Sequence, residues 1–203
     1  MTKLSKAEQA IETKGKILAA ATRAIARCGV RGLRLDEVAK EAGVAISLIY
    51  YYFKTREDLV HATLQSANDL AVLGMHSNAS GETTGREQLI SLLTGEFSDR
   101  DEVRQMAVVW SEATACAAFD ETLVPYVVEA TKTWVEIVSG LIRKGVEDGS
   151  INPNVDVMTS AERLTVLVEG LSAKWLARVY TTERVLQILT SALRLEFGAS
   201  GDG

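Results

Sequence analysis

The side chains best suited to acid–base or nucleophilic catalysis are few in this 203-residue chain, and they form no constellation. His61 and His76 stand 15 positions apart, without the HExxH spacing that turns two imidazoles toward one metal ion. Cys116 and Glu112 follow on a different segment, and no nucleophile elbow or phosphate-binding loop is present in the sequence. We therefore expect no enzyme, no cofactor and no metal. Catalysis that disappeared with Cys116→Ala would favour the opposite interpretation.

Charge is divided unevenly along the chain. Residues 1–60 contain 11 Lys and Arg against 7 Asp and Glu, a net charge of +4, although the whole chain carries −5. Residues 61–203 contain 11 basic and 20 acidic side chains, a net charge of −9. We call residues 1–60 the head and residues 61–203 the body. The basic charge of the head indicates that it binds a partner that carries phosphate groups.

Composition favours a globular protein built of long helices. The hydrophobic fraction is 47%, the charged fraction is 24%, and only Pro125 and Pro153 can break a helix. No run of 18 uncharged apolar residues and no apolar leader occurs, so we expect a cytoplasmic protein with no membrane partner. Cys28 and Cys116 lack the paired spacing of a metal or redox motif, which suits reduced structural thiols.

Apolar periodicity predicts an all-α fold, with an N-terminal three-helix domain of helix-turn-helix layout and a longer C-terminal helical domain. We place the domains at residues 1–55 and 56–198, followed by a disordered tail at 199–203. A polar, glycine-bearing loop is expected at 77–85. The helices are predicted at 7–28, 35–42, 45–53, 56–75, 86–97, 101–118, 121–147, 155–179 and 183–197.

The two short helices at 35–42 and 45–53 have the layout of a helix-turn-helix, with Gly43-Val44 as the turn. In this motif the second helix can enter the major groove of DNA while the first lies across the backbone. The same segment can also be a small packing unit without DNA binding, in which the run Tyr50-Tyr51-Tyr52-Phe53 is a core aromatic cluster.

A resemblance rests on two quoted stretches. Residues 32–44 read Gly-Leu-Arg-Leu-Asp-Glu-Val-Ala-Lys-Glu-Ala-Gly-Val, and residues 48–59 read Leu-Ile-Tyr-Tyr-Tyr-Phe-Lys-Thr-Arg-Glu-Asp-Leu. Together they resemble the DNA-binding signature of the TetR family of transcriptional regulators, over about residues 11–60. The chain departs from that signature at Arg34 and Ala45, where the family often has a hydroxyl residue that caps a helix.

The resemblance implies roles for individual positions. Tyr50 and Lys54 would contact backbone phosphates, and Arg34 can reach a phosphate beside the second helix. Ala45, Ile46, Ser47 and Tyr51 would face the base edges. The small and apolar side chains among them favour contacts with thymine methyl groups and readout of DNA shape. The expected DNA-binding residues are Arg34, Ala45, Ile46, Ser47, Tyr50, Tyr51, Lys54 and Thr55.

Bulky Met and aromatic residues recur on the helices of the acidic body. Such side chains either pack a core or line an apolar ligand cavity between bundle helices. Because the TetR resemblance implies a small-molecule effector, we expect a pocket there; a regulator whose body serves only to dimerise is the alternative. The candidate ligand-binding residues are Met106, Trp110, Phe119, Tyr126, Trp134 and Trp175.

The last two predicted helices carry adjacent apolar stripes. The resemblance implies that they form a four-helix dimer interface with a second copy, which would place two heads about one DNA turn apart. The function thus expected is a DNA-binding repressor that binds a near-palindromic operator as a homodimer and is released by a small, largely apolar ligand. The candidate interface residues are Leu164, Val168, Leu171, Val185, Ile188, Leu189 and Ala192.

Overall fold

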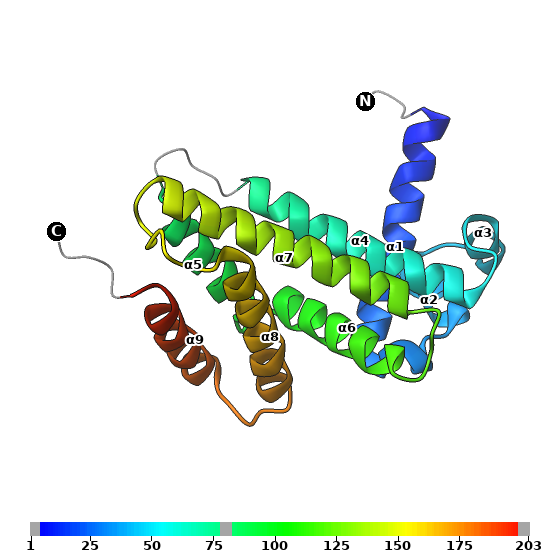
Figure 1. Cartoon of the computed structure of the whole chain (residues 1–203). Helices are drawn as coiled ribbons and strands as arrows, with labels where there is room; N and C mark the ends of the chain where they lie inside the picture. Colours follow the sequence, from blue (N-terminus) through cyan, green and yellow to red (C-terminus); the bar gives the residue numbers. More distant parts are fainter. Residues whose placement is uncertain (1–4, 78–82, 199–203) are drawn as a thin grey trace. The chain divides into compact units, whose positions relative to one another are not determined.

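A computed structural model describes residues 5–77 and 83–198, and these residues form helices joined by short connections without any strand (Figure 1). The all-α fold class predicted from the sequence is therefore confirmed. None of the helices in these ranges is both long and apolar enough to cross a bilayer. The helices are α1 (Lys6–Gly32), α2 (Leu35–Ala42), α3 (Ile46–Tyr52), α4 (Arg56–Ser77), α5 (Gly85–Gly95), α6 (Asp101–Ala117), α7 (Val124–Glu147), α8 (Val157–Leu176) and α9 (Thr182–Phe197).

Side-chain caps determine where several helices begin. Ser5 and Thr84 each form a capping box with the glutamate three positions later, at the start of α1 and α5. Asp156 caps α8 and Thr181 caps α9 through a side-chain oxygen that accepts from a backbone N–H. These polar residues satisfy donors that the first helical turn leaves unpaired.

The first helix differs from its prediction at its C-terminal end. Gly29 adopts φ +73° and ψ 169°, which breaks the helix, and one further turn follows before Leu33. The predicted stop at Gly29 is thus correct in place but is a kink rather than an end. The predicted loop at 77–85 includes residues 78–82, which lie outside the described residues. The predicted tail at 199–203 lies wholly outside them.

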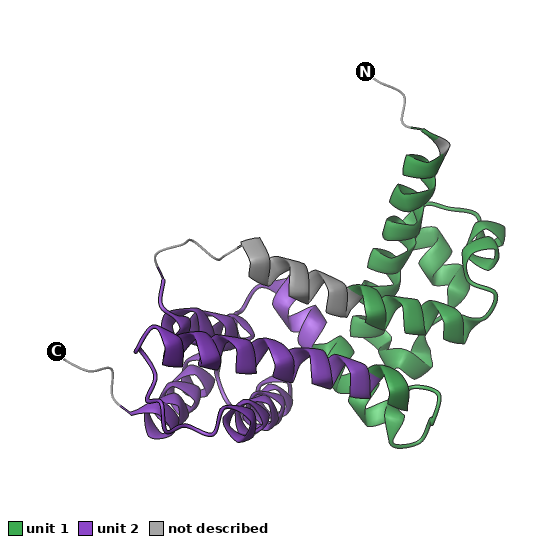
Figure 2. Ribbon diagram, turned by 45° about the horizontal axis from the view of Figure 1, so that its top comes forward, with its two compact units in different colours: residues 1–70, 108–126 green, residues 71–107, 127–203 purple. Residues whose placement is uncertain are grey.

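The chain forms two compact units (Figure 2). The first, here called the N-terminal unit, comprises residues 1–70 and 108–126; the second, the C-terminal unit, comprises 71–107 and 127–203. Helix α6 contributes its first turns to the C-terminal unit and its later turns to the N-terminal unit. These units follow packing, whereas the predicted division after residue 55 is functional and stays a prediction.

The C-terminal unit is held by an apolar core that α5, α7, α8 and α9 share. Among its largest fully buried side chains are Leu89, Ile142 and Leu189. At the start of α5 the backbone of Gly85 lies so close to that of Gly145 on α7 that a Cβ at position 85 would be 2.1 Å from the Gly145 nitrogen. Glycine at position 85 is therefore what lets the two helices approach.

A buried arginine ties the ends of this unit together. Arg86 on α5 donates to the carbonyl oxygens of Phe197 (3.4 Å) and Gly198 (2.5 Å), at the C-terminal end of α9. It also donates to the Ser150 carbonyl at 3.5 Å. The cation thereby satisfies carbonyl groups that a helix end leaves without intrahelical partners, where its charge is also favoured by the helix dipole.

Candidate nucleic-acid interface

The turn between α2 and α3 is made by Gly43, which ends α2 in the left-handed conformation with φ +68°. Its N–H bonds back to the carbonyl groups of Ala39 and Lys40. Val44 donates to Ala39 at 3.0 Å, which closes the turn. The two helices that the sequence predicted at 35–42 and 45–53 thus form with the expected tight connection.

Helix α3 presents one face to its own unit and the other outward. Ile49 is fully buried, and Phe53 directly after the helix is 4% exposed. Tyr50 is 52% exposed and Tyr51 is 78% exposed, so neither belongs to a core aromatic cluster. Ala45, Ile46 and Ser47, at the helix start, are exposed as well. The five outward residues of this segment are all among those that the resemblance implied as contacts with DNA.

The three remaining candidates for DNA contact are also exposed, and Arg34 and Thr55 have local partners. Arg34 lies 3.4 Å from the carboxylate of Asp36 and offers no side-chain cap to α2. Lys54 is exposed immediately before α4. Thr55 has a role that the sequence interpretation missed: its Oγ1 accepts from the N–H of Asp58 (3.0 Å), and its own N–H donates to the Asp58 carboxylate (3.1 Å). Thr55 therefore caps α4.

Two arginines of α1 hold α2 in place through a single carboxylate. Arg23 and Arg27 donate to the two oxygens of Glu41, at 2.5 and 2.6 Å. The hydrogen bond from Arg27, and then that from Arg23, keeps the pKa of Glu41 below its ordinary value despite desolvation. Arg23 and Arg27 precede Glu41 by 18 and 14 positions and lie on a different helix. The spacing of residues within one helix therefore could not predict these two contacts.

Arg56, in the first turn of α4, joins that helix to the end of α1. Its guanidinium donates to the carbonyl oxygens of Val30 and of Leu33, the latter at 3.1 Å. These bonds give a side-chain donor to carbonyl groups at the kinked end of α1. Charge-assisted hydrogen bonds thereby join α1 both to α2 and to α4, the two helices that precede and follow α3 in the chain.

Helix α6 also contacts the kinked end of α1, through Glu112. The carboxylate of Glu112 accepts from the N–H of Val30 at 3.1 Å, and a Cβ added to Gly29 would lie 2.4 Å from Glu112 Oε2. The contact needs the absence of a side chain at position 29. Glu112, weighed from the sequence only as a catalytic acid, is in fact part of this packing contact.

Three of the candidate ligand-binding residues lie in the N-terminal unit, and each has a different environment there. Tyr126 stacks on the imidazole of His61, with ring centroids 4.2 Å apart. Phe119 is 81% exposed beside the guanidinium of Arg31, and Trp110 is half-buried. His61 Nε2 is buried and has no hydrogen-bond partner within the described ranges.

The other three candidates lie in the C-terminal unit. Met106 is half-buried on α6, and Trp134 packs against the apolar core from α7. Trp175, which is 2% exposed, meets Phe97 edge-on at 5.8 Å and lines a pocket of about 570 Å³. The six predicted ligand residues are thus divided between two units, and Trp175 alone among them lines this pocket.

Most of the candidate dimer residues are occupied within their own chain. Five of them belong to the core of the C-terminal unit: Leu164, Val168, Leu171, Val185 and Leu189. Ile188 and Ala192 are half-buried. The apolar side chains that α8 and α9 leave outward are others, chiefly Val166 (67% exposed) and Leu195 (87% exposed). These stripes thus contribute to the internal packing of the C-terminal unit, and the interface that the resemblance implied at these seven residues stays a prediction.

Two family models match the chain in separate segments. Residues 17–63 match the model described as bacterial regulatory proteins of the tetR family. Residues 85–198 match the model described as the C-terminal part of BetI-type transcriptional repressors. The first match covers the exposed face around α3, and the second covers the whole core of the C-terminal unit.

Solved structures show the same architecture. A protein of Rhodococcus sp. described as a TetR-family transcriptional regulator is 35% identical, with a TM-score of 0.84 over 92% of this chain and 99% of that one. A Saccharomonospora viridis regulator in complex with choline is 23% identical, with a TM-score of 0.82 over 92% and 98%. FadR from Bacillus subtilis in complex with stearoyl-CoA is 23% identical, with a TM-score of 0.74 over 91% and 98%.

Proposed function

The chain belongs to the TetR family of transcriptional regulators, and we propose that it is a cytoplasmic repressor that binds a near-palindromic operator as a homodimer. One observation carries the proposal: α3 buries Ile49 and leaves a continuous outward face. A helix held this way at a tight turn can enter the major groove.

Within that face, we assign two kinds of contact. The exposed hydroxyl of Tyr50 and the ammonium of Lys54 contact backbone phosphates and fix the register of the head. Ala45, Ile46 and Ser47 reach the base edges, where methyl and methylene groups favour contact with thymine. Tyr51 faces the base edges beside them, and Arg34 and Thr55 flank this set. The Thr55 hydroxyl can still donate to a phosphate while its oxygen caps α4.

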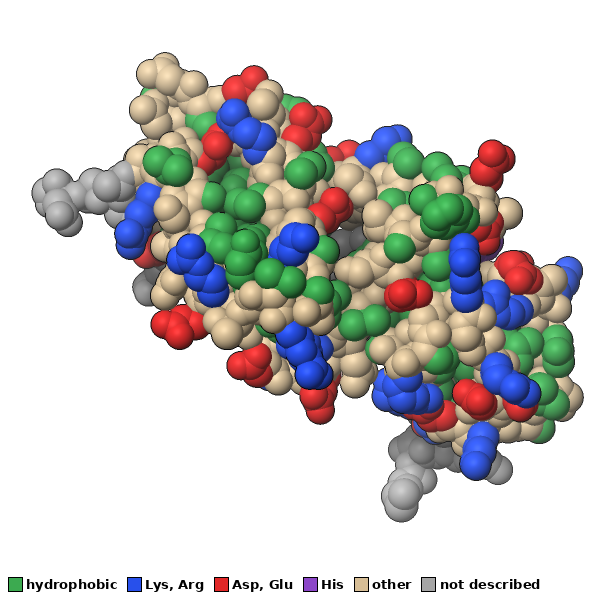
Figure 3. Space-filling model, turned by 90° about the horizontal axis from the view of Figure 1, so that it is seen from below, with side chains coloured by type: hydrophobic (Ala, Val, Ile, Leu, Met, Phe, Trp, Pro, Cys, Tyr) green, Lys and Arg blue, Asp and Glu red, His purple; other side chains and the backbone are tan. Residues whose placement is uncertain are grey.

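Two copies are required because one short helix buries too little surface to select a site. We propose that the copies meet through the outward apolar surface of α8 and α9, including Val166 and Leu195, with Ile188 and Ala192 at its border. In Figure 3 hydrophobic side chains gather on the face of the C-terminal unit turned to the viewer, among Lys and Arg side chains. Light scattering of the purified chain should give twice its 22.0 kDa mass, and a Val166→Glu, Leu195→Glu variant should be monomeric.

We propose that a small, largely apolar molecule releases the repressor from DNA. The fold that this chain shares holds stearoyl-CoA in one relative and choline in another, which supports an effector of small-molecule size. Trp134 and Trp175 lie in the C-terminal unit that matches the BetI-type model. Stearoyl-CoA, choline and a hydrophobic compound library should therefore be screened for a rise in melting temperature and for weaker operator binding. A library without effect on either would favour a body that serves only to dimerise.

DNA binding is tested most directly by fluorescence anisotropy. The operator is first identified by selecting the genomic DNA fragments that bind to the full-length protein. A labelled copy of that operator is then titrated with the protein at several salt concentrations. We expect tight binding that weakens steeply with salt, and loss of that binding in a Tyr50→Ala, Lys54→Ala variant.

Lys132→Gln, on α7 of the C-terminal unit, is the matched control because it removes an exposed lysine far along the chain from the face. Circular dichroism establishes that each variant is folded. Selection of no sequence above background, or equal operator affinity in the Tyr50→Ala, Lys54→Ala variant, would overturn the assignment.

A further inference from the structure

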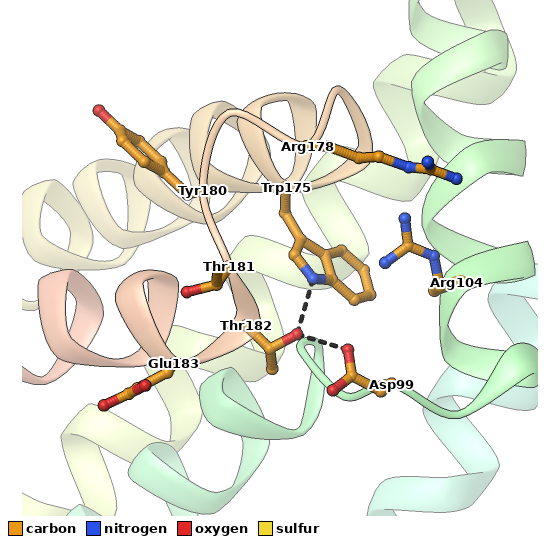
Figure 4. Close-up of a pocket in the computed structure, with 8 residues that line it drawn as sticks. All are labelled: Asp99, Arg104, Trp175, Arg178, Tyr180, Thr181, Thr182 and Glu183. Carbon is orange, nitrogen blue, oxygen red and sulfur yellow. Dashed lines mark hydrogen bonds between the residues drawn. The ribbon is translucent and has the colours of Figure 1, made fainter.

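The C-terminal unit contains a pocket whose lining residues take no part in the proposed contacts with DNA. Its volume is about 570 Å³, and it lies where the connection before α6 meets the connection from α8 to α9 (Figure 4). Eight residues line it: Asp99, Arg104, Trp175, Arg178, Tyr180, Thr181, Thr182 and Glu183.

The indole of Trp175 is the fixed element of this pocket. Its Nε1 donates to the hydroxyl of Thr182 at 2.9 Å, and that hydroxyl donates to the carboxylate of Asp99 at 2.6 Å. Both bonds are drawn in Figure 4. The chain of bonds holds the ring in one orientation and occupies Asp99, so that this carboxylate already has a partner within the protein.

The guanidinium groups of Arg104 and Arg178 lie beside the indole of Trp175 in this pocket. Arg104 on α6 lies over the ring, 4.6 Å from its centroid. Figure 4 shows Arg178 extending to the same side of the indole as Arg104, away from Glu183. Neither guanidinium group has a hydrogen bond or an ion pair in the part of the chain that the structure describes, whereas the Glu183 carboxylate accepts from Gln187 at 3.4 Å.

The backbone at Arg178 is a second indication. This residue has φ +58°, the only positive φ of a non-glycine residue within 5–77 and 83–198. It stands just past the end of α8, with Arg178 N–H bonded to Trp175 and Val179 N–H bonded to Lys174. Glycine or asparagine is the usual residue at such a helix end, because other side chains are strained there. Arginine at this position is explained if its side chain is needed in the pocket.

We propose that this pocket is a binding site for a small oxyanion, the carboxylate or phosphate group of a metabolite, held between Arg104 and Arg178. A planar guanidinium donates two parallel hydrogen bonds to either group, and stacking on Trp175 leaves the N–H edge of Arg104 free for them. The anion also relieves the repulsion between two like charges that face the same side of the indole. Tyr180 also lines the pocket, but Figure 4 shows its hydroxyl directed away from the indole and from the two arginines.

Such a ligand would act on a helix that belongs to both units. Arg104 is in the first turns of α6, and Glu112 two turns later contacts Gly29 and Val30 near the end of α1. An anion that ties Arg104 to Arg178 restrains α6 relative to α8 in the C-terminal unit. The site is thus a place for an effector separate from the apolar ligand proposed above, and its existence does not depend on DNA binding.

Binding is measured without DNA, on the full-length protein. A Trp110→Phe, Trp134→Phe variant leaves Trp175 as the only tryptophan of the chain, so its fluorescence reports on this pocket. Inorganic phosphate and succinate are titrated separately at constant ionic strength, with chloride as the reference anion. We expect a saturable change in emission with at least one of them, and the stronger of the two identifies phosphate or carboxylate as the preferred group.

The variants Arg104→Gln and Arg178→Asn should each weaken that binding roughly tenfold or more, the effect of losing one charge-assisted hydrogen bond. Asparagine is chosen at 178 because it tolerates a positive φ. Arg184→Gln is the matched control: this exposed arginine lies on α9, outside the pocket lining, and its loss should leave binding unchanged. Emission that changes only linearly with either anion, or equally in Arg184→Gln and Arg104→Gln, would overturn the proposal.

Discussion

Replacing Gly29 by alanine should break the contact between α6 and the end of α1. Gly29 has φ +73° and ψ 169°, a region of backbone conformation that is essentially restricted to glycine. The new Cβ would also stand 2.4 Å from Glu112 Oε2, closer than such atoms approach, so the carboxylate has to move. Once displaced, it no longer accepts the hydrogen bond from Val30 N–H, now 3.1 Å long.

The expected loss of stability has two parts. The backbone strain costs about 1–3 kcal/mol. The hydrogen bond to a charged acceptor contributes about 1.5–3 kcal/mol. Gly29→Ala should therefore lower the free energy of unfolding by roughly 3–5 kcal/mol, whereas Glu112→Ala alone loses only the hydrogen bond.

A double-mutant cycle separates these parts. Unfolding by urea is followed by circular dichroism for Gly29→Ala, Glu112→Ala and the double variant. Because alanine at position 112 has no carboxylate to displace, the double variant should be about 2 kcal/mol more stable than the two single losses predict. Gly43→Ala is the control: it also has positive φ, but its Cβ would meet nothing within 4 Å, so its cost should add to that of Glu112→Ala.

Losses for Gly29→Ala and Glu112→Ala that add within about 0.5 kcal/mol would refute this reasoning. That result would mean that the carboxylate and the glycine act independently, and that the contact does not transmit a change at α6 to α1.

Further variants test the charge assignments. Burial raises the pKa of Glu96 to about 7, so the folded protein keeps a proton that the unfolded chain releases above pH 4.5. Its free energy of unfolding should fall between pH 4.5 and 7, by on the order of 3 kcal/mol, and Glu96→Gln should remove this fall in urea titrations across that range. Arg86→Ala should cost about 3 kcal/mol by the same assay, because three backbone carbonyls lose their donor. Lys54→Gln should reduce the slope of log affinity for the operator against log salt by about 2 per dimer, as two phosphate contacts disappear.

Each of these has its own control. An identical pH profile for Glu96→Gln and the unmodified chain would remove Glu96 as the cause. Arg100→Ala should change stability by less than about 0.5 kcal/mol, because the Arg100 side chain is exposed and bonds only to the Ser98 hydroxyl among described residues. An unchanged salt slope for Lys54→Gln would show that this ammonium does not neutralise a phosphate.

Local chemistry was enough to predict much of the N-terminal unit. Helices α2 and α3 begin and end within about one residue of their predicted bounds, because Gly43 is the only residue there suited to a left-handed turn. The TetR resemblance carried by residues 32–59 is confirmed, and with it the prediction of a regulator without catalytic function. The exposure of Tyr50 and Tyr51 follows from the burial of Ile49 one helix face away.

The sequence also determined which side chains are apolar and at what spacing they recur along each helix. This spacing does not determine which other helix, or which other molecule, packs against the apolar face. The stripes of α8 and α9 pack inside their own unit, where Leu164 and Leu189 are buried. Partners far apart in the chain, such as Glu112 with Val30 or Arg104 with Trp175, were decided only by tertiary structure. Such contacts depend on loop closure and on the packing of whole helices, and neither leaves a periodic pattern in the residues themselves.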